Sequence, residues 1–301
     1  MLGRNDDAVV VIVQPGETQA ILAKRYLGDE RKAWRVTSLE PDKAWRSGVA
    51  AVVAMRPIDP GGVLGPQAQR APILCYHRFT VGKPDRMAVS AAAFEKQLQY
   101  LRDNGFTVVP LRDLNAFLAG QGELPPKAVV LTIDDGYRSA YEIAYPLLRR
   151  FNVPATIFVY SDFLGARDGL TPAQLKEMAQ SGLVDIQSHT KTHADLRWRK
   201  PGRPSPDYLK RTQQELAAPR EKLTPVAGSG LDALAYPYGA ADTQVLELTA
   251  KSGYALGLTV LRGGNAGWTD PLLLHRDMVF GGDSLEQFAK RLAPARQGLA
   301  R

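Results

Sequence analysis

Two pairs of residues carry side chains that could bind a metal ion and activate water. Asp134 and Asp135 directly follow an apolar run at 128–133, and His189 and His193 stand four residues apart in a chain with four histidines. Imidazoles at this spacing share one face of a helical turn and can reach one ion. With one carboxylate they form a site that suits zinc, iron, cobalt or nickel and leaves room for water.

The adjacent carboxylates can do different work. In an extended chain, neighbouring side chains point to opposite sides, so one carboxylate can bind the ion while the other faces a different neighbour. A surface turn is an equally good interpretation of Asp134-Asp135-Gly136, because Asp-Gly is common in turns. His189 and His193 could likewise be unrelated loop residues, but the low histidine count favours a metal pair.

Cys75 and His77 offer a different chemistry. They lie two residues apart, so a strand would place both on one face, as a cysteine–histidine hydrolase would need. That mechanism has no use for His189 and His193, and a buried strand cysteine usually behaves as an inert small hydrophobic residue. We therefore favour the metal site.

Alternating strands and helices are expected to position these residues. Short apolar runs lie at 73–76, 107–109, 128–133, 155–160, 184–186, 234–236, 256–260 and 272–274. Helical patterns lie between them, at 91–103, 113–118, 140–151, 172–179, 208–216, 243–252 and 285–292. This alternation is typical of an α/β fold with parallel strands, and seven or eight repeats favour a closed or nearly closed barrel. The polar residues that follow the strands should meet at one rim.

Three segments carry a resemblance to a known family. T-I-D-D-G at 132–136 resembles the T-F-D-D-G motif of the polysaccharide deacetylases, the NodB-homology family or carbohydrate esterase family four. S-H-T-K-T-H at 188–193 resembles its S-H-[ST]-x-x-H motif, and A-Y-P-Y-G at 235–239 resembles its R-x-P-[YF]-G motif. I-L-C-Y-H at 73–77 is similar to the start of the branch that includes the poly-N-acetylglucosamine deacetylases.

The resemblance spans about residues 71–295 and implies a distorted, incomplete (β/α) barrel with metal-dependent N-deacetylase activity. It implies that Asp135, His189 and His193 hold the metal, with zinc preferred to cobalt, nickel or iron. Asp134 would be the general base for the attacking water. The backbone N–H of Tyr238 would help to stabilise the oxyanion, for which some donor is required.

Two histidines compete for the role of general acid, which must protonate the leaving amine. The Y-H branch takes the acid from the first strand, which points to His77. His275, in L-L-H at 273–275, resembles the L-x-H motif that supplies the acid in other members. We expect His77 to be the acid. Ala235 stands where many members have the arginine that orients the base, so Asp134 must be held in another way. Trp268 is the nearest candidate for the family's D-x-x-D-W motif.

The first 60 residues are predicted to form a separate small unit. An apolar run at 9–13, two helical patterns starting near residues 18 and 29, and a second apolar run at 49–55 give the order strand, helix, helix, strand. V-Q-P-G-E-T at 13–18 and Y-L-G-D at 26–29 resemble a LysM domain, a βααβ module that binds N-acetylglucosamine-containing glycans. Residues 61–71 are expected to be a linker and 72–301 the catalytic domain.

Composition limits the other possibilities. The chain has 301 residues, 45% of them hydrophobic, and a net charge of +7, which permits but does not establish affinity for anionic surfaces. A single cysteine excludes a disulfide framework, and no apolar run is long enough for a membrane span. Residues 197–211 are rich in arginine, lysine and proline, and they form either a binding surface for an anionic polymer or a solvated surface with no partner. They give no separate support for nucleic-acid binding.

The expected function is hydrolysis of the N-acetyl group of N-acetylglucosamine in a cell-envelope or extracellular polysaccharide. The candidate polymers are poly-β-1,6-N-acetylglucosamine, peptidoglycan and chitin-like chains. The alternatives are a non-catalytic glycan-binding protein and a deacylase for small molecules. Such a substrate implies an extracytoplasmic location, whereas the charged start M-L-G-R-N-D-D lacks a signal-peptide pattern. We therefore expect the export segment to be missing from this sequence.

Overall fold

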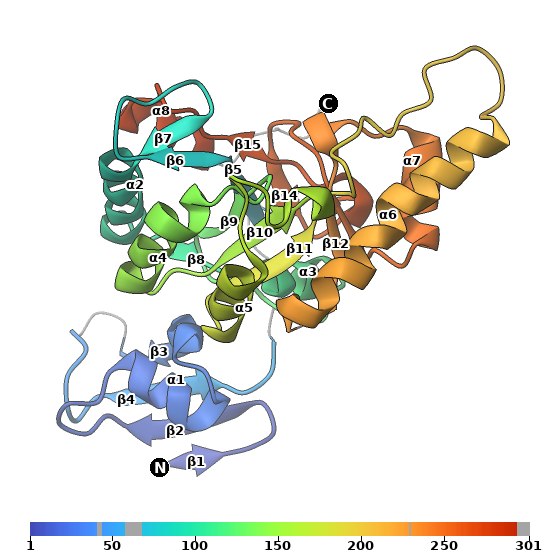
Figure 1. Cartoon of the computed structure of the whole chain (residues 1–301). Helices are drawn as coiled ribbons and strands as arrows, with labels where there is room; N and C mark the ends of the chain where they lie inside the picture. The colour runs from blue at the N-terminus through green and yellow to red at the C-terminus, as the bar shows by residue number, and fades with distance from the viewer. Residues whose placement is uncertain (41–43, 58–67, 229, 294–301) are drawn as a thin grey trace.

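The structure, a computed structural model, describes residues 1–40, 44–57, 68–228 and 230–293. They form two units, each with its own sheet and its own apolar core (Figure 1). The expected boundary at residue 60 lies outside the described residues. The expected linker end is placed too late, because Arg70 and Ala71 already pair with a strand of the second unit.

The N-terminal unit contains a four-stranded antiparallel sheet in the order β1-β2-β4-β3. Its elements are β1 (Gly3–Arg4), β2 (Ala8–Ile12), α1 (Gln19–Leu27), η1 (Glu30–Arg35), β3 (Val36–Ser38) and β4 (Ala50–Ala54). The predicted strands at 9–13 and 49–55 correspond to β2 and β4, whereas β1 and β3 were not predicted. The second helix is a short 3₁₀ helix, because β-branched Val36 and Thr37 continue as a strand that pairs with β4.

The second unit is built on parallel strands that curl into an incomplete barrel. Their order is β13 (Leu256–Leu258), β12 (Ala233–Ala235), β11 (Val184–Ser188), β10 (Ala155–Val159), β9 (Ala128–Ile133) and β5 (Arg70–Tyr76). Further pairings come from β8 (Thr107–Val108), β14 (Gly264–Ala266) and β15 (Asp277–Met278), while β6 (Arg78–Thr80) and β7 (Ala88–Ser90) pair separately. Seven of the eight predicted runs contain a strand.

The eighth run, at 272–274, was wrongly predicted to be a strand. Its first part is the 3₁₀ helix η5 (Pro271–Leu273), and the strand follows later as β15. Leu274 forms an isolated bridge with Leu258 of β13, and β15 pairs with β5. This segment spans the gap between the two edges of the sheet, and its sparse pairing leaves the barrel incomplete.

Helices surround the barrel (Figure 1). They are α2 (Ala91–Asp103), α3 (Leu111–Leu118), η2 (Ala140–Ala144), α4 (Tyr145–Phe151), α5 (Pro172–Gln180), α6 (Pro206–Ala227), α7 (Thr243–Lys251) and α8 (Leu285–Leu292), with short 3₁₀ turns η3 (Ser161–Phe163) and η4 (Pro237–Gly239). Local chemistry sets the ends: the Ser90 hydroxyl accepts from the Ala93 N–H, and Thr171 forms a capping box with Gln174.

Helix α6 is much longer than the predicted 208–216, and it runs through Pro219 and Pro225. Proline normally interrupts a helix because it lacks an N–H and clashes with the preceding turn. Pro219 falls on the buried stripe of the helix, whose members are Tyr208, Thr212, Leu216, Pro219, Leu223 and Ala227. Packing of this stripe at helical spacing offsets the lost hydrogen bond.

Strand β9 shows how the barrel separates its two faces. Val129, Leu131 and Ile133 belong to the core under the outer helices, whereas Ala128 and Val130 belong to the inner core. Helix α3 contributes Leu111, Leu114 and Phe117 to this inner core. The interior is therefore apolar where the strands begin. Among the described residues, no helix is long and apolar enough to cross a membrane.

Candidate active site

The predicted site residues meet where the parallel strands end. His77 follows β5, Asp134 and Asp135 follow β9, and His189 follows β11. Ligand atoms of Asp135, His189 and His193 lie within 4.8 Å of one another, and so do those of Cys75, His77 and Asp134. The two groups are adjacent, because His189 Nε2 is 4.0 Å from Asp134 Oδ2.

The first group has the spacing of a metal site. Asp135 Oδ1 is 3.4 Å from His189 Nε2 and 3.4 Å from His193 Nε2. Two ligand atoms bound about 2.1 Å from a tetrahedral ion stand about 3.4 Å apart, so a zinc-sized ion fits between them. Oxygen and nitrogen ligands of this kind suit zinc, cobalt, nickel or iron(II).

A hydrogen bond orients the His189 ring for this role. Its Nδ1 lies 2.7 Å from the carbonyl oxygen of Ala235, so Nδ1 carries the proton that it donates. Nε2 then faces Asp135 and can bind a metal ion in its unprotonated form.

The loop that carries the two histidines is not the helical turn that their spacing suggested. Thr190 and His193 adopt left-handed backbone angles, with φ of 69° and 63°. The Glu215 carboxylate on α6 holds the loop by accepting hydrogen bonds from the N–H groups of Lys191 and Thr192, at 3.1 and 2.8 Å. The two imidazoles therefore point in one direction because Glu215 fixes the conformation of the loop between them.

Left-handed backbone is concentrated at this site. Asp135 and Tyr238 have φ of 74° and 60°, so four of the six described non-glycine residues with positive φ lie here. Such residues cost free energy and persist where the surrounding structure fixes them, as at functional sites. The turn at Asp135, rather than an extended chain, sends the two adjacent carboxylates in different directions.

Asp134 is held by a residue that sequence reasoning missed. Arg276 Nη1 and Nη2 donate to Asp134 Oδ1 and Oδ2 at 2.7 and 2.8 Å, and both side chains are almost fully buried. Burial alone would raise the pKa of Asp134, but Arg276 and His189 hold it below its usual range. Ala235 cannot form an ion pair with Asp134, and Arg276, which directly precedes β15 beside β5, does so instead.

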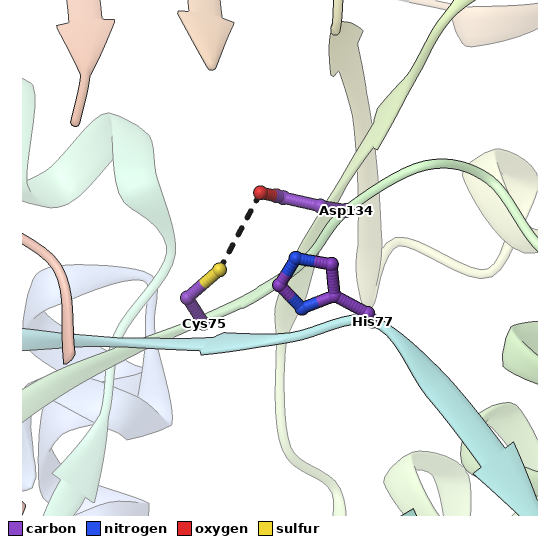
Figure 2. Close-up of side chains that lie close together, drawn as sticks. All are labelled: Cys75, His77 and Asp134. Atoms are coloured by element: carbon purple, nitrogen blue, oxygen red, sulfur yellow. Dashed lines mark hydrogen bonds between the residues drawn. The ribbon is translucent and has the colours of Figure 1, made fainter. Parts of the chain in front are cut away.

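Cys75 lies next to Asp134 (Figure 2). Its thiol donates to Asp134 Oδ2 at 3.4 Å. Burial raises the pKa of the Cys75 thiol well above its usual range, so the thiolate nucleophile of a cysteine hydrolase is disfavoured. The structure thus supports Cys75 as a hydrogen-bonding neighbour of Asp134.

The two candidate acids lie in different places. The His77 ring is beside Asp134 (Figure 2), and its Nδ1 is buried without a hydrogen-bond partner among the described residues. His275 lies with Arg70 and Trp268 around a separate cavity of about 290 Å³. Arg70 begins β5 and His77 follows its end, so this cavity is about 20 Å from His77 along the strand.

Aromatic rings line the exposed side of the metal-ligand group. Tyr238 is 68% exposed, and its ring lies 4.8 Å from that of His193. Tyr160 lies 5.5 Å from His193 and stacks on Phe163 at 4.9 Å. The close packing of Gly239 against the Val260 backbone fixes the turn that carries Tyr238, since a Cβ there would meet that nitrogen at 2.5 Å.

The two carboxylates thus have different surroundings. Asp135 lies between two imidazoles, whereas Asp134 forms a buried ion pair with Arg276. A hydrolase needs this separation when an ion activates water and a second group takes the proton. The position of these residues at the strand ends is where enzymes built on (β/α) barrels place their active sites.

Comparison with known proteins identifies the family. The polysaccharide deacetylase family model matches residues 121–257. Over 219 residues the chain is 31% identical to Bacillus subtilis (strain 168) YxkH, whose name places it among the polysaccharide deacetylases; the match covers 73% of this chain and 75% of that protein. The chain belongs to the polysaccharide deacetylase family.

Two further relatives are informative. The poly-β-1,6-N-acetyl-D-glucosamine N-deacetylase of Escherichia coli (strain K12) is 30% identical over 241 residues, which cover 68% of this chain but only 36% of that protein. The Streptococcus pyogenes deacetylase PplD, solved in complex with acetate, has a TM-score of 0.68 and 27% identity, and covers 76% of this chain and 100% of that one. These matches confirm the predicted mixed α/β fold with a curled, barrel-like sheet.

Proposed function

We propose that the protein is a metal-dependent N-deacetylase acting on N-acetylglucosamine residues of a cell-envelope or extracellular polysaccharide. The observation that carries the proposal is the division of work between adjacent aspartates. Asp135 shares a 3.4 Å contact with each histidine, whereas Asp134 is buried against Arg276. A non-catalytic glycan-binding protein would have no need for this arrangement.

Each residue has a role in acetamide hydrolysis. A zinc ion held by Asp135, His189 and His193 would polarise the acetamide carbonyl and lower the pKa of water. Asp134, which its ion pair keeps in the carboxylate form, accepts the proton of the attacking water. The Tyr238 backbone N–H would stabilise the negative charge that develops on the acetamide oxygen.

The leaving amine needs a proton before the carbon–nitrogen bond can break. We assign this step to His77, because it lies beside Asp134 and His275 does not. Burial lowers the pKa of His77, although Asp134 and Asp135 oppose this effect. The products are acetate and a sugar with a free amine.

The N-terminal unit favours a polymer over a small molecule as substrate. We propose that it is a LysM-like glycan-binding module spanning residues 1–60, followed by a linker that ends before β5 begins at Arg70, and that the protein acts outside the cytoplasm. A pull-down of residues 1–60 with peptidoglycan or chitin tests the module. If residues 1–60 bind neither peptidoglycan nor chitin, the proposed binding role is wrong and the unit serves only as a spacer.

Acetate release from defined polymers tests the activity. Poly-β-1,6-N-acetylglucosamine, as named for the Escherichia coli relative, chitin oligomers and peptidoglycan fragments should be compared after loading with zinc, cobalt or nickel. We expect acetate from at least one polymer. Metal binding with no acetate from any of them would contradict the proposal.

A further inference from the structure

A positively charged segment begins beside the metal-ligand group. Residues 195–211, here called the arm, contain six lysines or arginines and two aspartates. Their net charge of +4 is more than half of the +7 carried by the whole chain. The arm starts two residues after His193, and α6 continues from it (Figure 1). The charge of this protein is thus concentrated next to its candidate active site.

The arm is held in place by its own contacts. The Trp198 and Tyr208 rings lie 4.9 Å apart, and the Tyr208 hydroxyl donates to the Leu196 carbonyl at 2.6 Å. Asp195 forms ion pairs with both Arg197 and Arg199, at 2.8 and 2.5 Å. One carboxylate therefore serves two guanidinium groups, which leaves a positive charge at the base of the arm.

Four further cations of the arm have no ion-pair partner in the part of the chain that the structure describes: Lys200, Arg203, Lys210 and Arg211. All four are exposed. Arg211 stands one helical turn before Glu215, whose carboxylate holds the amides of Lys191 and Thr192 between the two histidines. Exposed cations of the arm therefore reach to within one helical turn of Glu215, which holds the histidine loop.

The described acids near the arm have partners outside it or bind backbone amides, and none of them forms an ion pair with the four exposed cations. Asp162 is paired with Lys191 at 2.5 Å. Asp242 caps α7 by accepting from the Val245 N–H and also accepts from the Trp198 N–H. Glu215 is occupied by backbone amides. A glycan that passes the arm would therefore meet more exposed cations than exposed carboxylates.

The proposed reaction changes the charge of its own substrate. Water adds to a neutral acetamide, acetate leaves, and the sugar keeps an amine that binds a proton near neutral pH. Each turnover therefore adds about one positive charge to the polymer. Like charges repel over about a Debye length, which covers the neighbouring sugars at low salt.

We propose that the arm makes the enzyme select N-acetylated, uncharged stretches of glycan over stretches that already carry free amines. This inference rests on the proposed deacetylase function. Repulsion of the cationic product speeds its release, and it disfavours attack next to a deacetylated sugar. The arm thus limits how densely one polymer is deacetylated.

The test compares two hexasaccharides, one fully acetylated and one with a single N-acetylglucosamine flanked by glucosamines. The ratio of their kcat/KM values is measured near pH 6, where the amines are protonated, for wild type and for K200Q/R203Q/R211Q. We expect the triple variant to lower the wild-type preference for the acetylated substrate by roughly threefold to tenfold at about 10 mM salt, and the difference to vanish at about 0.5 M. K96Q/K176Q/K222Q, which neutralises three exposed helix lysines elsewhere, should keep the wild-type ratio.

The pH of the assay gives a second control. Near pH 8.5 the amines lose their protons, so the ratio should approach that of the triple variant, whereas titration of the enzyme itself cancels between substrates. An unchanged ratio in the triple variant, or a ratio insensitive to salt, would overturn the inference.

Binding separates this inference from the proposed function. Asp134→Asn cannot activate water but keeps the arm, so its affinity for both hexasaccharides can be measured without turnover. If wild type releases no acetate, the proposed function fails, while tighter binding of the acetylated hexasaccharide still supports the arm. Equal affinity for the two, or no measurable binding of either, overturns the role of the arm.

Discussion

At the residue scale, the site depends on which partner each side chain has. Asp134 and Asp135 are adjacent in sequence but differ in surroundings, one against Arg276 and the other between two imidazoles. The sequence predicted which residues gather here, because their positions after strands imply one rim. It could not identify Arg276, because that role depends on the pairing of β15 with β5, which a two-residue strand does not reveal.

Removal of Arg276 should destabilise the fold. Arg276→Met leaves a buried carboxylate without its counter-charge, which costs about 3–5 kcal/mol. The free energy of urea unfolding measures this loss. Combination with Asp134→Asn should recover part of it, because the unpaired charge is gone. Strictly additive effects of the two substitutions would show that the pair does not stabilise the fold as proposed.

The two candidate acids should respond differently to substitution. His77→Ala should lower kcat by about 10²- to 10⁴-fold while metal content stays unchanged, because the leaving amine loses its proton donor. His275→Ala should keep nearly full activity, because His275 lies in the separate cavity with Arg70. Full activity in the His77 variant would contradict the assignment.

At the element scale, strands and helices were more predictable than the loops between them. The helices 91–103 and 285–292 and the strand 128–133 match their predicted bounds, since apolar spacing and capping residues define them locally. The histidine loop was predicted wrongly as a helical turn. Its left-handed residues depend on Glu215, which lies more than twenty residues away on α6.

The hydrogen bonds from the histidine loop to Glu215 should control metal affinity. Glu215→Ala releases the amides of Lys191 and Thr192, so the two imidazoles lose their fixed directions, and zinc affinity should fall by about 10- to 100-fold. Titration against a chelator of known affinity measures the change. Glu221→Ala, at an exposed position on the same helix, is the matched control. Equal zinc affinity in the Glu215 variant and the control would show that the loop keeps its conformation without Glu215.

At the scale of the whole molecule, the N-terminal unit and the site lie at opposite ends of the barrel strands. Arg35 of the first unit is 3.7 Å from Glu123, which precedes the start of β9, whereas Asp134 follows its end. The six residues of β9 span about 20 Å. A glycan held by the first unit therefore cannot place the same sugar at Asp134, so the unit would act as an anchor for long chains.

Deletion of residues 1–67 tests this arrangement. The KM for an insoluble polymer should rise by about tenfold or more, because the second attachment point is lost. The kcat/KM for a tetrasaccharide should stay near the wild-type value, because its four sugars contact only the barrel. An equal loss on both substrates would mean that the unit supports the barrel itself.

The central claim is that Asp134 activates water beside an ion held by Asp135, His189 and His193. Metal-stripped protein should be reloaded with one equivalent of zinc, and acetate and free amine should be counted on N-acetylglucosamine oligomers for wild type and Asp134→Asn. We predict equal amounts of acetate and amine from wild type, and at least a thousandfold lower rate from the variant at the same zinc content. Equal rates from both proteins, or full activity without metal, would contradict the account.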